Sequence, residues 1–170
     1  MEYIPLANMF TKLVLRLKSE VQELRYIDAD LGQLDHYDIR PAVAWPCCLI
    51  DLDEFKFIET GNKLRQIGDG FITLRIGLVR FSESNNLVAD NVRLNALRFY
   101  SIENKINQAI HGWEDEGFSR LLRRFAGTER RTDDIRVRVV KYAVTYNDNV
   151  HPSVITVPRP EAQISPGVKL

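Results

Sequence analysis

Three acidic residues close together, Asp51, Asp53 and Glu54, are the first candidates for chemistry in this sequence. Asp51 and Asp53 are two positions apart, so on a β-strand their carboxylates would point to the same face. Paired carboxylates of this kind can hold a divalent cation, as they do in two-metal nucleases. The spacing is common, however, and no third ligand of the usual hydrolase kind accompanies it. We therefore interpret these acids as a solvated strand face and predict no metal site.

Histidine offers a second candidate for metal chemistry. Asp35, His36 and Asp38 form a short polar segment that could contribute to a transition-metal site. The other two histidines, His111 and His151, lie far away in the sequence. A loop that caps its own turns through Asp side chains explains the segment more simply.

Cys47 and Cys48 are the only cysteines in the chain. Adjacent cysteines can bond to each other only through a strained ring, so we predict two reduced thiols that pack in or near a strand. This count excludes a disulfide framework and a four-cysteine zinc site. The motifs of phosphate loops, serine-hydrolase elbows and zinc proteases are also absent. We predict no cofactor and no enzymatic activity.

Charge is unevenly placed along a chain whose net charge is zero. Residues 1–60 hold eleven acidic and six basic residues, whereas residues 118–141 hold eight basic and three acidic residues. A basic segment can bind nucleic acid, or it can meet the acidic segment of the next copy of the same chain. Charges that are merely solvated on one subunit are the third interpretation.

The basic segment contains a series of arginines from Arg120 to Arg138, with Phe118 just before them and Phe125 among them. Arginine beside aromatic residues is typical of a groove that follows single-stranded nucleic acid. Three acidic residues dilute this basic ridge, and no recognition motif accompanies it. A nucleic-acid-binding accessory protein is therefore the alternative function, and ion pairing with an acidic neighbour is preferred.

Two helices and several strands would position these residues. Apolar residues recur at helical spacing in residues 6–25 and 91–111, and Asp90 is placed to cap the second helix. Strands or extended segments are expected at residues 26–31, 42–57, 70–81, 118–125 and 135–146. Single helices between antiparallel hairpins predict an α+β fold, with a mainly antiparallel sheet, two helices packed on one face and a long projecting hairpin.

The two long strands show apolar residues on more than one face. Residues 70–81 alternate regularly, but in residues 135–146 the apolar phase shifts by one position at Val140. The shift indicates either a β-bulge or a strand whose far half is sandwiched between its own core and a neighbouring subunit. Strands of this length exceed the usual strand of about 5 to 6 residues, so part of each is expected to project as an arm.

Length and composition favour one domain. We expect a single α+β domain at residues 1–148 and a proline-rich C-terminal arm at residues 149–170. There is no run of about 18 apolar residues that could span a membrane, and the first residues lack the features of a secretory signal. We expect the protein in the cytoplasm of the cell that makes it.

The element order and two segments together resemble a known family. The segments are residues 30–51 (DLGQLDHYDIRPAVAWPCCLID) and 128–142 (TERRTDDIRVRVVKY). They are similar to small proteins of prophage morphogenesis clusters, and the layout resembles the tail terminator, or tail completion, proteins of long-tailed bacteriophages. The resemblance covers the chain to about Tyr146 and includes no diagnostic motif.

The resemblance implies a structural protein of the virion that forms a ring, commonly a hexamer, at the joint between tail and head. Its partners would be its own copies and other tail or connector proteins, with DNA contacted only indirectly or through the lumen. It would assemble in the cytoplasm of the bacterial host. The expected apolar interface residues are Phe71, Val79, Phe81, Tyr142, Val144 and Tyr146. The residues expected at a charged interface or the lumen are Arg75, Arg123, Arg124, Arg136 and Arg138.

Overall fold

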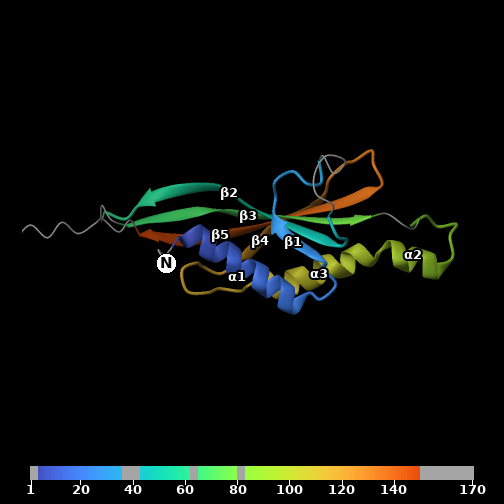
Figure 1. Ribbon diagram of the computed structural model, residues 1–170, viewed down its shortest axis with the longest axis horizontal. Coiled ribbons are helices and arrows are strands. Elements are labelled where there is room, and N and C mark those ends of the chain that lie inside the picture. Colours follow the sequence, from blue (N-terminus) through green and yellow to red (C-terminus); the bar gives the residue numbers. More distant parts are fainter. Residues whose placement is uncertain (1–3, 36–42, 62–64, 80–82, 150–170) are drawn as a thin grey trace, which may run out of the picture.

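The computed structural model describes residues 4–35, 43–61, 65–79 and 83–149. Within them the chain forms three helices and five strands, shown in Figure 1. In chain order these are α1 (Pro5–Glu20), β1 (Tyr26–Ala29), β2 (Cys47–Glu59), β3 (Arg65–Val79), α2 (Asp90–Ala96), α3 (Arg98–Ile110), β4 (Leu122–Thr128) and β5 (Ile135–Asn149). The C-terminal arm expected after residue 148 lies almost wholly outside the described residues.

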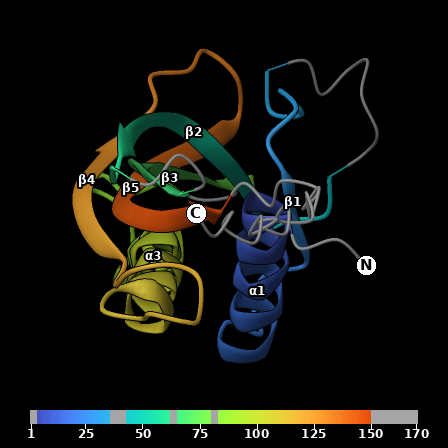
Figure 2. The ribbon, with the colours of Figure 1, turned by 90° about the vertical axis from the view of Figure 1, so that its left-hand side faces the viewer.

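The strands form one sheet in the order β1-β2-β3-β5-β4. All neighbours are antiparallel except β1 and β2, which are parallel. Seen along the strands in Figure 2, α1 and α3 lie side by side beneath one face of the sheet, and β1 and β4 are at opposite edges. The predicted α+β class, with a mainly antiparallel sheet and two helices on one face, is confirmed.

The helices follow the apolar stripes of the sequence. Helix α1 begins at Pro5, a favoured first helical residue, and buries Met9, Leu13 and Leu17. It ends at Glu20 rather than at residue 25. The predicted helix 91–111 is interrupted at Leu97 and forms α2 and α3, because only the second part has an apolar stripe against the sheet. Helix α2 buries none of its residues.

Two hydrophobic cores lie on opposite faces of the sheet. The larger core fills the space between the sheet and helices α1 and α3. The smaller core comprises Leu34, Val43, Cys47, Leu49, Ile135 and Val137, with Tyr26 and Trp45 packed against it. Parallel strands require a crossover connection. The chain between β1 and β2 is that crossover, and its residues Leu34, Val43 and Trp45 cover the second face.

These two cores explain the phase shift in β5. Ile135 and Val137 point into the smaller core, whereas Val140 and Tyr142 point into the larger one. The pairing of β3 with β5 is continuous, so β5 has no bulge toward β3. Both predicted explanations are therefore wrong, because the strand is apolar on two faces within a single subunit.

Bulges occur instead in the strands next to this central pair. In β2 the register shifts between Asp53 and Lys56, and Glu54 has a positive φ of 46°. In β4 the register shifts between Arg123 and Phe125. Other strand boundaries also differ from expectation: β2 begins only after Pro46, β3 begins before residue 70, and β4 lies later than residues 118–125.

The β2–β3 hairpin and the end of β5 extend beyond the helix layer, as Figure 1 shows. Here Tyr146 of β5 packs edge-to-face on Phe55 of β2, with ring centroids 5.1 Å apart, and also contacts Phe57. Gly68, the partner of Tyr146 in the β3–β5 ladder, lies beneath its ring. We call this extension the arm. Its aromatic packing holds β2, β3 and β5 together at this end of the sheet.

Candidate interaction surfaces

The residues considered for metal chemistry form no metal site in the part of the chain that the structure describes. Within the described ranges, no group of three or more His, Cys, Asp or Glu side chains could hold a metal ion. Asp35 accepts hydrogen bonds from Arg75, and His111 Nδ1 accepts one from the backbone N–H of Arg123. Residues 36, 38 and 151 lie outside the described part of the chain.

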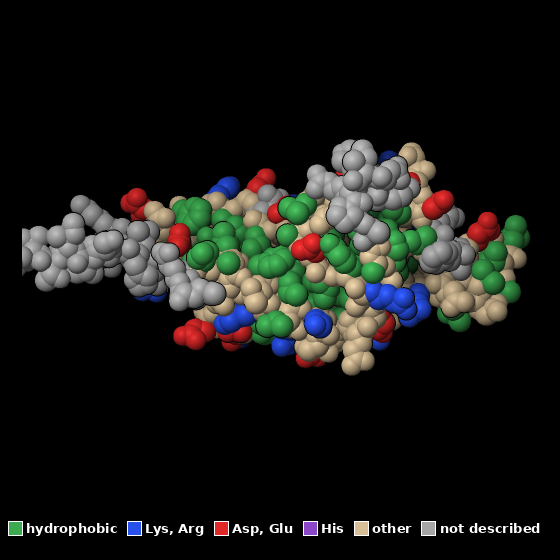
Figure 3. All heavy atoms as spheres, in the orientation of Figure 1, with side chains coloured by type: hydrophobic (Ala, Val, Ile, Leu, Met, Phe, Trp, Pro, Cys, Tyr) green, Lys and Arg blue, Asp and Glu red, His purple; other side chains and the backbone are tan. Residues whose placement is uncertain are grey.

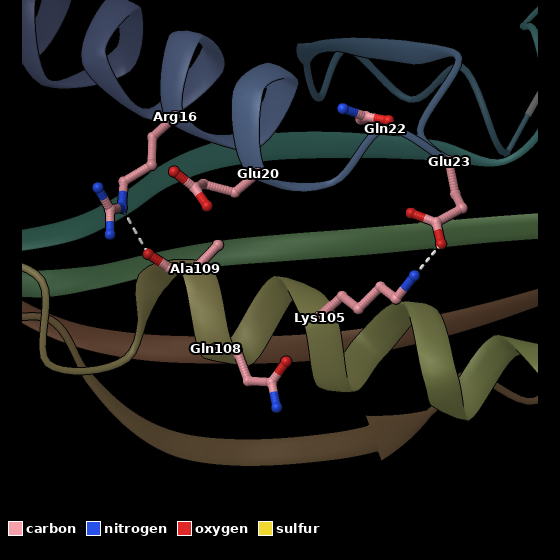
Figure 4. A pocket seen from close by; sticks show the side chains of 7 residues that line it. All are labelled: Arg16, Glu20, Gln22, Glu23, Lys105, Gln108 and Ala109. Carbon is pink, nitrogen blue, oxygen red and sulfur yellow. Dashed lines mark hydrogen bonds and ion pairs between the residues drawn. The ribbon is translucent and has the colours of Figure 1, made fainter.

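A hollow of about 530 Å³ lies between α1 and α3 and is shown in Figure 4. Its walls are polar, and side chains pair across it: Lys105 forms an ion pair with Glu23, and Arg16 Nε donates to the Ala109 carbonyl at 2.5 Å. Glu20 and Gln22 complete the α1 side. These contacts join the two helices to each other, and the residues that line the hollow include no Ser, Thr, Cys or His.

A larger groove of about 870 Å³ lies where β3 and β5 meet α2 and α3. Val79, Ile135 and Phe99 contribute apolar walls, and Arg136 lies along it. The Arg136 guanidinium carbon is 3.6 Å from the centroid of the Phe99 ring, a close cation–π contact. Val79, an expected interface residue, is half-buried in this groove, and Phe81 lies outside the described residues.

The two cysteines behave as expected. Both are free and fully buried, and because they are consecutive in a strand they point into different cores. Burial raises the pKa of the Cys47 thiol to about 12 and also raises that of Cys48. Because thiols with raised pKa values stay protonated near neutral pH, the two cysteines are packing groups and not nucleophiles.

Arg75 is the centre of an ion cluster on the sheet face opposite the helices. It contacts Asp30 at 3.2 Å, Asp35 at 2.7 Å and Glu129 at 3.0 Å. Desolvation disfavours its charge, but the bond to Asp35 and the attraction of the other acids outweigh this, so its pKa is raised. Arg131 joins the cluster through Glu129, at 2.7 Å. Arg75 thus pairs with acids of its own subunit.

Arg136 and Arg138 point to the helix side of β5. Arg138 Nε donates to Glu103 of α3 at 2.6 Å, and both side chains are largely buried, with exposures of 12% and 9%. Arg136 stacks on Phe99 of the same helix. The prediction that these two arginines face a partner or a lumen is therefore wrong, because they join the sheet to α3.

Contacts within the subunit engage several arginines of the basic ridge and leave others exposed. Arg131, Arg136 and Arg138 are held within the subunit, and Phe118 is buried against Trp113, with ring centroids 5.1 Å apart. Phe118 is therefore unavailable for stacking on a base. Among the expected charged interface residues, those exposed are Arg123 and Arg124 on β4.

The expected apolar interface residues also separate into two groups. Tyr142, Val144 and Tyr146 are 0%, 2% and 4% exposed, and all belong to the larger core. Tyr142 also donates a hydrogen bond from its hydroxyl to Asn107 Oδ1 of α3, at 3.2 Å. Their prediction as interface anchors is wrong, because the helices of the same subunit cover them. Phe71, 38% exposed on the opposite face, stays a prediction.

Other apolar side chains, missed by the sequence analysis, are exposed at both ends of the molecule. The arm exposes Phe57 and Ile58 by 50% and 57%. Around α2, Leu87 and Leu94 are exposed by 89% and 69%. Figure 3 shows hydrophobic side chains at both ends of the view. A signal existed in the sequence, since Leu87 and Leu94 fall outside the buried stripe of α3.

The two outer edges of the sheet differ in charge. Along β2, residues 51–59 include four acids and one lysine. Strand β4 includes Arg123 and Arg124 and no acid. Both strands lie at or near an edge, because β1 pairs only with residues 47–50 of β2 and β4 is the last strand.

Comparisons with known proteins bear on the fold. No protein-family model matches the sequence, and no curated protein matches it. Among solved structures, the chain is similar to one from the virion of a native gene transfer agent particle, with a TM-score of 0.55 and 10% sequence identity. The match covers 86% of this chain and 100% of that chain. At this identity the likeness establishes a shared fold. Separately, none of the described helices is long and apolar enough to cross a membrane.

Proposed function

We propose that this protein is a structural, non-enzymatic component of a phage-like virion. The observation that carries the proposal is the fold likeness, which extends over the whole length of a chain from a gene transfer agent virion. That chain is part of a particle, and a shared architecture over the full length favours a shared type of role. The earlier family resemblance points the same way by a separate route.

Within the virion, we assign it to the tail terminator, tail completion or head–tail joining proteins, acting as a ring of identical subunits. The molecule is elongated, with exposed apolar side chains at both ends, around α2 and on the arm. Unlike surfaces on one molecule suit a heterologous contact, which closes into a ring when the rotation between copies allows it. The proposed partners are further copies and neighbouring tail or connector proteins, met in the cytoplasm of a bacterial host.

The nucleic-acid-binding alternative has less support. Four of its arginines pair or stack within the subunit, and one of its two aromatic residues is in the core. In a ring, the exposed Arg123 and Arg124 would serve contacts between subunits, with DNA contacted at most through the lumen.

Deletion of the gene from the genome that encodes it, followed by negative-stain electron microscopy of released particles, tests the role. A terminator stops growth of the tail tube, so its loss should give tubes of uncontrolled length. A joining protein should instead leave heads and tails of normal length unattached. Normal, infectious or gene-transferring particles from the deletion strain would rule out both roles.

A further inference from the structure

We propose that neighbouring copies join through their sheets, with the outer edge of β2 in one subunit pairing with the outer edge of β4 in the next. This inference rests on the proposed ring and names the contact that builds it. The partner at each edge is a second copy of this chain.

The β2 edge is available along most of the strand. Strand β1 pairs with residues 47–50, and the N–H of Asp30 adds a bond to the Ile50 carbonyl. Within the described residues, positions 52–59 pair with a strand only on the β3 side. Their outward N–H and C=O groups are therefore a template for another strand.

The β4 edge is available over a shorter stretch. Residues 111–113 flank its start, where Trp113 accepts from the N–H of Leu121 and His111 from that of Arg123. From residue 124 to residue 128, the described chain pairs with β4 only through β5. The open stretch of β4 is shorter than the open stretch of β2, so all of it can pair with β2 of a neighbouring copy.

Charge makes the two edges complementary. Glu54 and Glu59 are exposed on the acidic β2 edge, and Arg123 and Arg124 are exposed on the basic β4 edge. Charged, bulged edges ordinarily prevent strand pairing, and both edges here are charged and bulged. Because each edge carries mainly one sign, repulsion prevents like edges from pairing, whereas unlike edges attract. The arrangement excludes a symmetric dimer and selects a head-to-tail contact.

Strand direction and apolar contacts fit the same joint. Strands β2 and β4 run in opposite directions, so a copy placed alongside in the same orientation presents β4 antiparallel to β2. By register, Ile58 and Phe125 both lie on the face opposite the helices, and they are 57% and 51% exposed. Across the joint they would form an aromatic–aliphatic contact, which stabilises antiparallel pairs.

A charge-swap experiment tests the contact. One variant carries Arg123→Glu and Arg124→Glu, so both of its edges are acidic. A second carries Glu54→Lys and Glu59→Lys, so both of its edges are basic. The third combines all four substitutions. A matched control, Lys18→Glu with Arg98→Glu, changes the net charge as much as the first variant but on exposed helical positions. Circular dichroism and thermal melts establish that each variant folds.

Sedimentation velocity and native mass spectrometry then compare assembly over a range of concentrations. We expect each two-substitution edge variant to associate at least about tenfold more weakly than the wild type, because like charges then face each other. An equimolar mixture of the two should assemble, the four-substitution chain should recover the wild-type oligomer, and the helical control should be unchanged.

Several outcomes would overturn the inference. These are a wild type that stays monomeric at high concentration, edge variants that assemble like the wild type, and four substitutions that fail to restore assembly in a folded chain. Loss of assembly on truncation after Asn149, with no response to the charge swap, would assign the edge to the chain's own C-terminal segment. A defined oligomer without a charge-swap effect refutes this contact and leaves the proposed function standing, whereas the deletion phenotype tests that function independently.

Discussion

The ring of Tyr146 lies directly on the backbone of Gly68, its partner across the β3–β5 ladder. A Cβ atom at residue 68 would come within 2.5 Å of Tyr146 Cε1. Phe55 and Phe57 pack edge-to-face against the same ring. The arm is therefore held by one aromatic cluster that needs a glycine beneath it.

Gly68→Ala should destabilise the protein by about 1–3 kcal/mol, because the added methyl group must displace a ring that its neighbours hold in place. Urea denaturation measures this cost, and Asp69→Ala, an exposed change in the same strand, is the control. In a Tyr146→Leu background the cost should shrink. An equal cost in both backgrounds would show that the ring is not the obstacle.

Tyr142→Ala should cost about 3–5 kcal/mol as a core truncation, and Tyr142→Phe about 1 kcal/mol for the hydrogen bond to Asn107. Both values should be the same at low and high protein concentration, because one subunit buries the side chain. A cost that appears only at concentrations where the protein oligomerises would instead place Tyr142 at an interface.

Arg75→Met should destabilise the fold by about 3 kcal/mol, because Asp30, only 10% exposed, then loses its partner. Chemical denaturation measures the loss. Adding Asp30→Asn to the same chain should recover part of it. The exposed change Arg124→Met should stay within about 0.5 kcal/mol of the wild type. Equal effects at the two positions would contradict the central place of Arg75.

Acid should weaken the fold through Asp133. The hydrogen bond from Arg131 lowers the pKa of this carboxyl in the folded state. The stabilisation is present above its unfolded pKa of about 3.9 and is lost as pH falls through the lowered folded value. The stability difference between wild type and Asp133→Asn should therefore be constant near neutral pH and shrink below about pH 4. Asp134→Asn controls for removing a charge at this turn, and a difference that grows in acid would contradict the assignment.

The thiols should be unreactive in the folded protein. Because burial raises the pKa of Cys47 to about 12 and raises that of Cys48, almost no thiolate exists near pH 8. Ellman's reagent should modify neither cysteine in native protein and both in denaturant. Fast modification of either thiol in the native state would mean that its core opens readily.

Patterns local in the sequence predicted much of the fold. The spacing of Leu13, Leu17 and Val21 follows the helical period, and the alternation in β3 follows the strand period, because each apolar face packs against the larger core. The α+β class follows from the order of these elements.

The predictions that were wrong concern residues whose contacts lie far away in the sequence. The phase shift in β5 has its cause in Leu34, Val43 and Trp45, which come from the crossover between β1 and β2. A crossover segment that covers the second face of a sheet has no hydrophobic periodicity by which the sequence could predict it. Tyr142 was therefore assigned to an open face when helices of its own subunit cover it.

Predictions for the charged residues were wrong for a similar reason. Arg138 reads as a basic surface residue, yet it pairs with Glu103, which comes from a helix far earlier in the chain. Arg123 and Arg124 are exposed, and no acid in β4 neutralises them, so their expected place at a charged interface or lumen stays a prediction. Their strand lies at an edge of the sheet, a position that depends on the topology of all five strands.

The unbroken pairing of β5 through both cores has a consequence for how the molecule comes apart. Strand β5 contributes Ile135 and Val137 to the smaller core and Val140 and Tyr142 to the larger core. Because the β3–β5 hydrogen bonds run without a break through both, unfolding of either core would disrupt pairing that the other core shares. The central strands should therefore exchange their amide hydrogens as a single cooperative unit, with similar protection from Ile135 to Val144.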